Sequence, residues 1–214
     1  MKNKRILERS VAVIVCSCLL MMALPLEFTE YVGGSVRAMA ATSGGDTFTA
    51  DGLNYTILSD NTSVKVTGAT DTAITELTIP DSVLYDNYDF QVTEIGIRAF
   101  ENYARLTQIV MGNNVERVCN YAFKGCKNLV TVILSDSLND AGYAAFMDCT
   151  RLEEITLPAS LTGNASEMFS GCKSLSAIKF AEGATTIPKG LFKNSTITAF
   201  ECPESITQIG GEAF

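Results

Sequence analysis

The stretch that decides the fold is AFKGCKNLVTVIL, residues 122–134. Nearly the same pattern returns as AFMDCTRLEEITL at residues 145–157 and as MFSGCKSLSAIKF at residues 168–180. In each copy, Cys stands three residues after Phe, and the copy ends in alternating apolar residues. Self-similarity at a fixed period indicates a repeat architecture in which each copy is one supersecondary unit.

Six phenylalanines set the period of this repeat. They are separated by 23 residues four times and then once by 22: Phe100, Phe123, Phe146, Phe169, Phe192 and Phe214. Leu follows six residues after each of the first four, and in the fifth copy Ile197 stands one residue early. An apolar residue follows three positions after each of these five. Residues 74–80, ITELTIP, match residues 152–158, LEEITLP, so a repeat strand precedes the first Phe.

Each unit predicts a short helical turn followed by a short strand. Apolar residues three apart around Phe and Cys favour the turn, and the period-two ending favours the strand. One such unit cannot bury its apolar side alone, whereas stacked units cover one another. We therefore predict an α/β solenoid of 23-residue repeats, with a parallel sheet on one face and short helices or turns on the other.

The residues ahead of the repeats have a different pattern. Residues 53–57 and 63–67 alternate apolar and polar, and the intervening SDNT is a turn signal. We predict a β-hairpin that caps the open end of the stack. The expected domains are a signal peptide over 1–40, an N-terminal β cap over 41–73 and leucine-rich repeats over 74–214, with the last repeat truncated.

The repeats resemble a known family. EIGIRAFENYARLTQIVM (residues 94–111) and the copies at 122–134 and 145–158 are similar to the BspA-like leucine-rich repeat of bacterial and some protozoan surface proteins. The resemblance covers about residues 48–214. It implies a right-handed superhelix in a secreted or surface-attached protein that binds other macromolecules, often as an adhesin. Asn164, Ala165 and Met168 depart from the family pattern, so that turn is expected to be looser.

The first forty residues have the plan of a secretory signal peptide. A basic start (MKNKR) precedes an apolar run at residues 11–26, and small residues occur at Ala38 and Ala40. We predict cleavage after Ala40. The alternatives are an N-terminal membrane anchor, disfavoured by Pro25 and by a run shorter than about 20 residues, and a lipoprotein at Cys16 or Cys18.

Composition excludes several classes of function. The chain has no His, which removes the commonest general base and metal ligand. Cleavage after Ala40 would leave eleven basic and twenty-one acidic residues, a net charge of −10. Nucleic-acid binding normally needs a basic face, so we expect no nucleic-acid partner. No second long apolar run follows, and we expect no membrane insertion after signal removal, no cofactor, no metal and no enzymatic activity.

Two other features have structural interpretations. The cysteines at the repeat position, Cys126, Cys149 and Cys172, are interpreted as small core residues rather than a redox or metal ladder, because no C-x-x-C pair occurs. The segment DNYD at residues 86–89 is interpreted as a turn rather than a calcium loop, since it lacks the distal Glu.

The outward positions of the predicted sheet form the candidate binding face. In each strand the residues before the inward Ile and Leu point out. The candidate residues are Glu76, Thr78, Gln108, Val110, Thr131, Ile133, Glu154, Thr156, Lys179 and Glu201.

Three functional hypotheses remain open. The first is a secreted or cell-surface interaction module that binds host or neighbour-cell protein. Binding would occur through the sheet face or through a β excursion from the repeat that contains Tyr85, Tyr88 and Phe90. The second is a structural spacer that presents another module. The third is the repeat region of an enzyme whose catalytic domain lies after Phe214, because the last copy stops partway and we expect a fragment or truncated reading frame.

Overall fold

The computed structural model describes residues 28–32, 35–39, 43–163, 165–195, 197, 200 and 202–214, with the backbone alone for 28–39. The chain divides into two compact units, residues 1–42 and 43–214. The first contains an antiparallel hairpin of β1 (Phe28–Val32) and β2 (Ser35–Met39). The apolar run predicted as the signal-peptide core and the predicted cleavage site after Ala40 lie outside the described residues.

The second unit begins with an antiparallel meander of β3 (Thr47–Ala50), β4 (Leu53–Ile57) and β5 (Ser63–Ala69). Strand β4 alternates as its sequence predicts, burying its three apolar side chains and leaving Asn54 and Thr56 half-buried. Strand β5 then pairs in parallel with β8 (Tyr88–Ile95). The meander is thereby joined by backbone hydrogen bonds to the first repeat coil.

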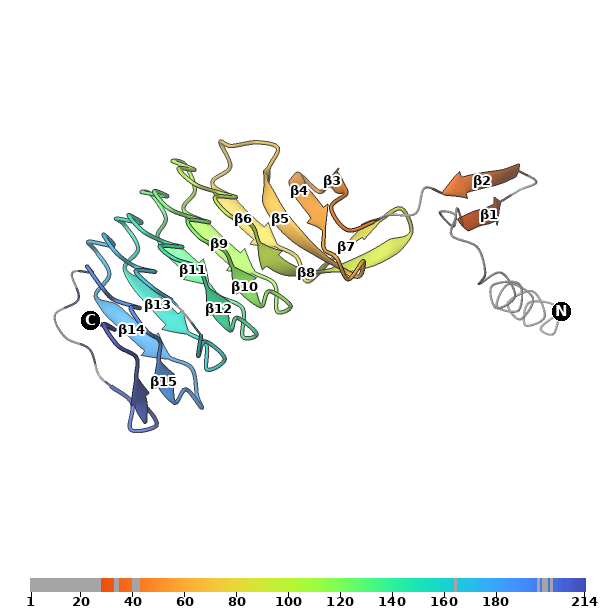
Figure 1. The fold of residues 1–214 in the computed structure, drawn as a ribbon. Helices are drawn as coiled ribbons and strands as arrows, with labels where there is room; N and C mark the ends of the chain where they lie inside the picture. The colour runs from red at the N-terminus through yellow and green to blue at the C-terminus, as the bar shows by residue number, and fades with distance from the viewer. Residues whose placement is uncertain are drawn as a thin grey trace. The chain divides into compact units, whose positions relative to one another are not determined.

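Most repeat coils carry a long strand and a short strand, and Figure 1 shows these strands lying side by side from coil to coil. The long strands are β6 (Glu76–Ile79), β9 (Gln108–Met111), β11 (Thr131–Ile133), β13 (Glu154–Leu157) and β14 (Ala177–Phe180). The short strands are β10 (Arg117–Val118), β12 (Asp140–Ala141), β15 (Thr186–Ile187) and β16 (Gln208–Ile209). Strand β7 (Ser82–Tyr85) is extra and pairs antiparallel with β8.

The expectation of a single sheet face was wrong. Strands β6, β9 and β11 form one parallel sheet and β13 and β14 another, while β8, β10 and β12 form a parallel stack on the opposite side of the coil. The short strands arise because their residues also alternate. Arg117 is exposed and Val118 is fully buried, which is the two-residue period of a strand.

The expectation of short helices, and with it the α/β class, was also wrong, since the described residues contain strands and turns but no helix. An α-helix uses each N–H for the carbonyl four residues back. Here alternate N–H groups reach the next coil, as in Phe100 N to Ala122 O and Asn102 N to Lys124 O, both 2.8 Å. Arg98 (φ 55°) and Asn102 (φ 61°) lie in the left-handed region, which interrupts any helical run.

The phenylalanine ladder forms the axis of the core. Neighbouring rings stack at 5.2 Å for Phe100–Phe123 and 5.0 Å for Phe123–Phe146, with interplanar angles of 4° and 13°. The first five rings are at most 1% exposed. Their burial confirms the prediction that these residues are structural.

The repeated cysteines are also packing groups. Cys126, Cys149 and Cys172 are buried, and each thiol lies 3.2–3.4 Å from the carbonyl oxygen of a Phe in the preceding coil. Burial raises the pKa of the Cys126 thiol to about 12. A neutral, enclosed thiol is a poor nucleophile, so the interpretation of these cysteines as small core residues is supported.

Candidate functional site

The long strands place the candidate residues on one exposed side. In β6 the burial alternates, so Leu77 and Ile79 face the core while Glu76 and Thr78 are exposed. Strands β11 and β13 repeat this alternation. We call the outward positions of β6, β9, β11, β13 and β14 the long-strand face. Alternation in the sequence was sufficient to predict which side chains lie on it, and their role in binding stays a prediction.

Cross-strand register brings an apolar patch to the middle of this face. Thr78 pairs with Val110, and Val110 pairs with Ile133 on the next strand. Ile133 is 52% exposed and lies beside half-buried Val110, so the two side chains form a small apolar area on this face. Gln108 pairs with Thr131 beside it, so polar groups border the patch.

The face is not continuous, and this feature was missed from the sequence. Backbone pairing joins β9 to β11 and β13 to β14, but among the described strands none joins β11 to β13. A groove of about 340 Å³ lies between these two strands. Its lining includes Thr131, Ile133, Asp136, Glu154, Thr156 and Pro158.

The groove is mixed in character. Ile133 and Pro158 are apolar, the hydroxyls of Thr131 and Thr156 donate or accept hydrogen bonds, and Asp136 and Glu154 bring negative charge. Unpaired peptide groups at a strand edge add further donors and acceptors. Such a set suits contact with a polypeptide surface rather than acid–base chemistry.

One ion pair lies at the C-terminal side of the groove. Lys179 Nζ is 2.8 Å from Glu154 Oε2, and the two side chains are 61% and 64% exposed. Pairs this exposed contribute little to stability. Lys179 and Glu154 therefore remain available to re-pair with a partner.

Two parts of the predicted site have different outcomes. Glu201 lies outside the described residues. In the excursion, Tyr85 and Tyr88 are exposed at 38% and 45%, but Phe90 is 1% exposed, so the expectation that Phe90 contributes to binding was wrong. Phe90 points into the core because it follows the alternation of β8. The DNYD segment forms the β7–β8 turn, with Asp86 and Asn87 both at positive φ.

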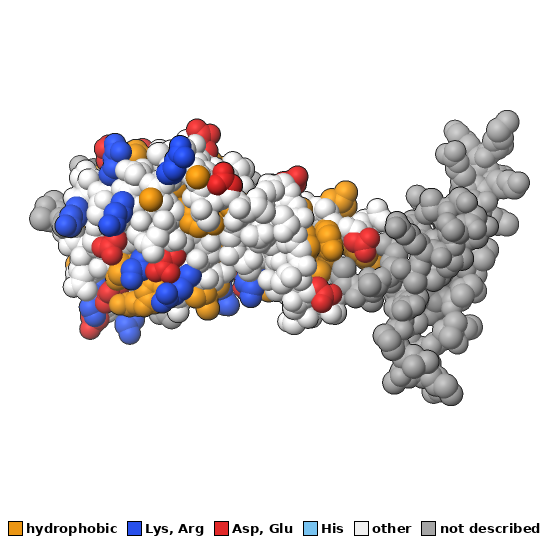
Figure 2. Space-filling view, turned by 90° about the horizontal axis from the view of Figure 1, so that it is seen from above, with side chains coloured by type: hydrophobic (Ala, Val, Ile, Leu, Met, Phe, Trp, Pro, Cys, Tyr) orange, Lys and Arg blue, Asp and Glu red, His pale blue; other side chains and the backbone are white. Residues whose placement is uncertain are grey.

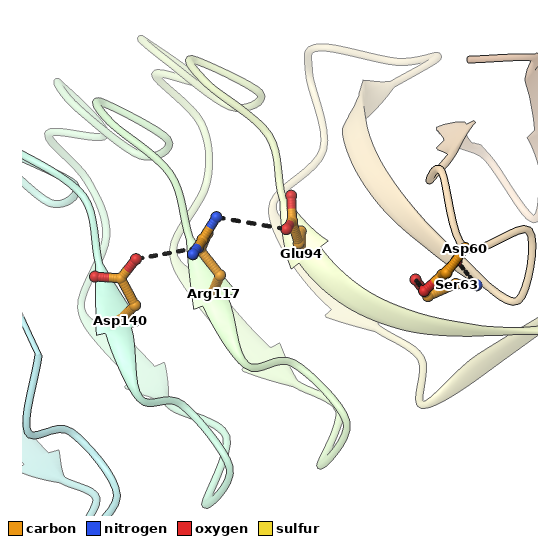
Figure 3. Close-up of polar contacts among 5 residues, drawn as sticks. All are labelled: Asp60, Ser63, Glu94, Arg117 and Asp140. Atoms are coloured by element: carbon orange, nitrogen blue, oxygen red, sulfur yellow. Dashed lines mark hydrogen bonds and ion pairs between the residues drawn. The ribbon is translucent and has the colours of Figure 1, made fainter. Parts of the chain in front are cut away.

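The opposite sheet carries a charged ladder that was not predicted (Figure 3). Arg117 Nε lies 3.0 Å from Asp140 Oδ2, and Arg117 Nη1 lies 3.7 Å from Glu94 Oε1. The three residues are spaced by 23 in the sequence, so the period itself was the available signal. Figure 3 also shows Asp60, whose carboxylate accepts hydrogen bonds from Ser63 and Thr62 that lower its pKa.

No catalytic or metal-binding constellation emerges from the described residues. They hold no group of three or more His, Cys, Asp or Glu placed to bind a metal ion. Across the same part of the chain, we find no helix with the length and apolarity required to span a bilayer.

Comparison with known proteins agrees with the repeat geometry. Residues 93–214 match the family described as BspA type leucine rich repeat region, in six copies. The predicted leucine-rich repeat fold and the predicted resemblance are thereby confirmed. No curated protein sequence matches the chain.

Several solved structures are similar. A leucine rich cell surface protein from Faecalibacterium prausnitzii is 24% identical over 81% of this chain and 53% of its own, with a TM-score of 0.58. A leucine-rich repeat protein from Bacteroides capillosus is 27% identical over 63% of this chain and 98% of its own, with a TM-score of 0.55. The pneumococcal vaccine antigen PcpA is 23% identical over 81% of this chain and 48% of its own, with a TM-score of 0.65. The chain spans about half the length of the first and third of these proteins, whose likeness concerns the fold.

Proposed function

Because the chain belongs to the BspA-type leucine-rich repeat family, we propose that residues 43–214 form a secreted or cell-surface module that binds another protein through the long-strand face. Repeat proteins use extended faces of this kind for recognition. The partner is proposed to be a host or neighbour-cell macromolecule, which makes the module adhesin-like. No catalytic step belongs to the proposal.

The observation that carries the proposal is the groove between β11 and β13, with exposed Ile133 at its edge. Interfaces concentrate their energy in a few apolar anchors surrounded by polar contacts that exclude water. Val110 and Ile133 supply such a centre, and Thr131, Glu154 and Thr156 supply the rim. The exposed strand edges add main-chain hydrogen bonds for an extended partner segment.

Binding to purified extracellular-matrix and cell-surface proteins is the direct test. We expect saturable binding to one of them, weakened at least tenfold by Ile133→Asp, since an anchor at the centre of an interface is replaced by a charge. Ile97→Asp is the matched control, because Ile97 is 66% exposed but lies on a different edge. Binding that responds equally to both substitutions, or to neither, would remove the long-strand face from consideration.

A second candidate is a structural spacer. The stacked coils, held by rings about 5–6 Å apart, make a rigid element that separates whatever lies on its two sides. A folded protein that binds none of the tested proteins would favour this alternative. It would also leave open the presentation of another domain, including an enzymatic one.

Three finer features belong to the same proposal. Secretion rests on the signal-peptide pattern of residues 1–40, and N-terminal sequencing of the exported protein should read from Ala41. The coils are proposed to follow a right-handed superhelix. Strands β3 to β5 are proposed to act as the N-terminal cap, supported by the pairing of β5 with β8.

A further inference from the structure

The repeat turns carry a concentration of positive charge in an otherwise acidic unit. The turn edge, as we define it, comprises residues 96–106, 119–129, 142–152, 165–175, 188–197 and 210–214. It contains eight of the eleven Lys and Arg of residues 43–214 but only four of the twenty-one Asp and Glu, a net charge of +4. The rest of the unit has a net charge of −14. Figure 2, which views the chain from above, shows Lys and Arg side chains at several points over the repeats.

Three of these cations lie in consecutive coils. Arg105, Lys127 and Arg151 are all exposed. Their segments are side by side, because Asn128 Nδ2 donates to Ala104 O at 2.7 Å and Thr150 Oγ1 donates to Lys127 O at 3.3 Å. The rings of the same coils are 5.2 and 5.0 Å apart, which sets the separation of the coils that carry the three charges.

The three cations are not neutralised by the protein. Within the part of the chain that the structure describes, none of them pairs with a carboxylate, and Arg151 donates only to the amide oxygen of Asn128, at 3.4 Å. In contrast, Arg98 pairs with Glu101 and Lys193 pairs with Glu212 on the same edge. Unpaired cations of one sign in a row attract an anionic ligand over roughly a Debye length.

We propose that the turn edge binds a linear acidic polysaccharide, one carrying carboxylate or sulfate groups, with Arg105, Lys127 and Arg151 as its anion contacts. Each of three consecutive coils contributes one of these cations, and side-chain hydrogen bonds join their segments, so the row fits a single linear chain running along the stack. A broad polyanionic surface would also meet the acidic remainder of the unit. This surface is separate from the long-strand face, and the proposal does not depend on the function proposed above.

Neighbouring side chains fit a sugar chain. Asn102 and Asn120 are exposed, and Asn128 and Thr150 are half-buried, so amide and hydroxyl groups line the same edge as the cations. Amides and hydroxyls both donate and accept, which matches the hydroxyl groups of a saccharide.

The aromatic residues of the edge do not fit a nucleic acid. Single-stranded nucleic acids bind on open aromatic rings that stack the bases. The Tyr121 ring instead has Arg98 at 5.1 Å and Lys124 at 5.2 Å from its centroid, and Tyr143 meets it edge-on. Tyr143 is itself held by a 2.8 Å hydrogen bond from its hydroxyl to Glu167.

The test uses the purified protein and heparin oligosaccharide as the probe, with neutral dextran and a single-stranded oligodeoxynucleotide as comparison ligands. We expect heparin to bind and salt to weaken that binding steeply. The triple variant R105Q/K127Q/R151Q should bind about tenfold more weakly, since each exposed ion pair contributes modestly. The double variant R105Q/K127Q is compared with the control K65Q/R117Q, which changes the net charge equally. Lys65 and Arg117 lie on β5 and β10, off the turn edge and off the long-strand face, so the control should bind as the parent does.

Each other outcome overturns the proposal. Equal losses in R105Q/K127Q and K65Q/R117Q would show a response to net charge alone. Single K127Q and K65Q variants repeat the comparison if either double variant fails to fold. Equal affinity for dextran or for the oligodeoxynucleotide would exclude recognition of an acidic polysaccharide. Salt-sensitive self-association by sedimentation, abolished by R105Q/K127Q/R151Q, would assign the edge to a second copy of the chain. Loss of heparin binding in Ile133→Asp would place the ligand on the long-strand face instead.

Discussion

Replacing Phe146 by Ala tests whether the phenylalanine ladder holds the coils together. The side chain is 0% exposed, and its ring lies 5.0 Å from Phe123 and 5.9 Å from Phe169. Its neighbours cannot collapse into the space, since Phe146 N is bonded to Met168 O and Phe123 N to Ala145 O. Core substitutions of Phe by Ala typically cost ~3–5 kcal/mol. For a unit of this size, that corresponds to a fall in Tm of about 10 °C.

Thermal and urea unfolding followed by circular dichroism measure this loss. Phe214→Ala is the matched control, because that ring is 55% exposed and should cost less than about 1.5 kcal/mol. Phe146→Leu keeps most of the apolar volume and should fall between the two. A Phe146→Ala protein that melts with the parent, or no lower than Phe214→Ala, would refute the idea that the stacked rings dominate the stability of the coils.

Three further predictions follow from buried and charged groups. Burial raises the pKa of Tyr55 from 10.0 to about 12. As the pH rises between these values, the tyrosine of the unfolded chain ionises first, so the free energy of unfolding falls by up to about 2–3 kcal/mol. Tyr55→Phe should change stability little at neutral pH and abolish this alkaline loss in urea titrations; an unchanged alkaline loss would contradict the assignment. Arg117→Gln should lower the free energy of unfolding by about 1 kcal/mol, because Glu94 and Asp140 lose their shared partner, whereas Lys179→Gln should lower it less. Added salt should shrink the difference between the two variants, and a difference that does not depend on salt would argue against an ionic origin. In the folded protein, mass spectrometry after thiol labelling should find exposed Cys202 modified and buried Cys126, Cys149 and Cys172 protected until unfolding, and rapid labelling of the buried three would show that the coils open.

The positions of the core residues could be predicted because a stacked repeat presents the same environment once per coil. Phe at a 23-residue interval and Cys three residues later are buried as expected, and strands β6, β11 and β13 alternate as their sequences predict. The alternation also gave the outward positions of the long-strand face, such as Glu76 and Thr78. These features depend on local pattern and period, which a sequence contains in full.

The turn conformation could not be predicted in the same way. Apolar residues three apart suit a helical turn, but in the structure the N–H groups of Phe100 and Asn102 bond to the following coil. The competing partner is 22 residues away in the sequence and becomes adjacent only after stacking. A hydrogen bond to the next coil therefore replaced the local one that the spacing suggested.

The sequence by itself determined the period, the family and the identity of the buried side chains, because each repeat must bury the same apolar groups against its neighbours. The tertiary structure decided which strands pair, and so where the long-strand face divides between β11 and β13. It also decided that Arg105, Lys127 and Arg151 form a row without carboxylate partners among the described residues. Pairing and charge neutralisation depend on distances between residues in different coils, and those distances exist only once the coils are stacked.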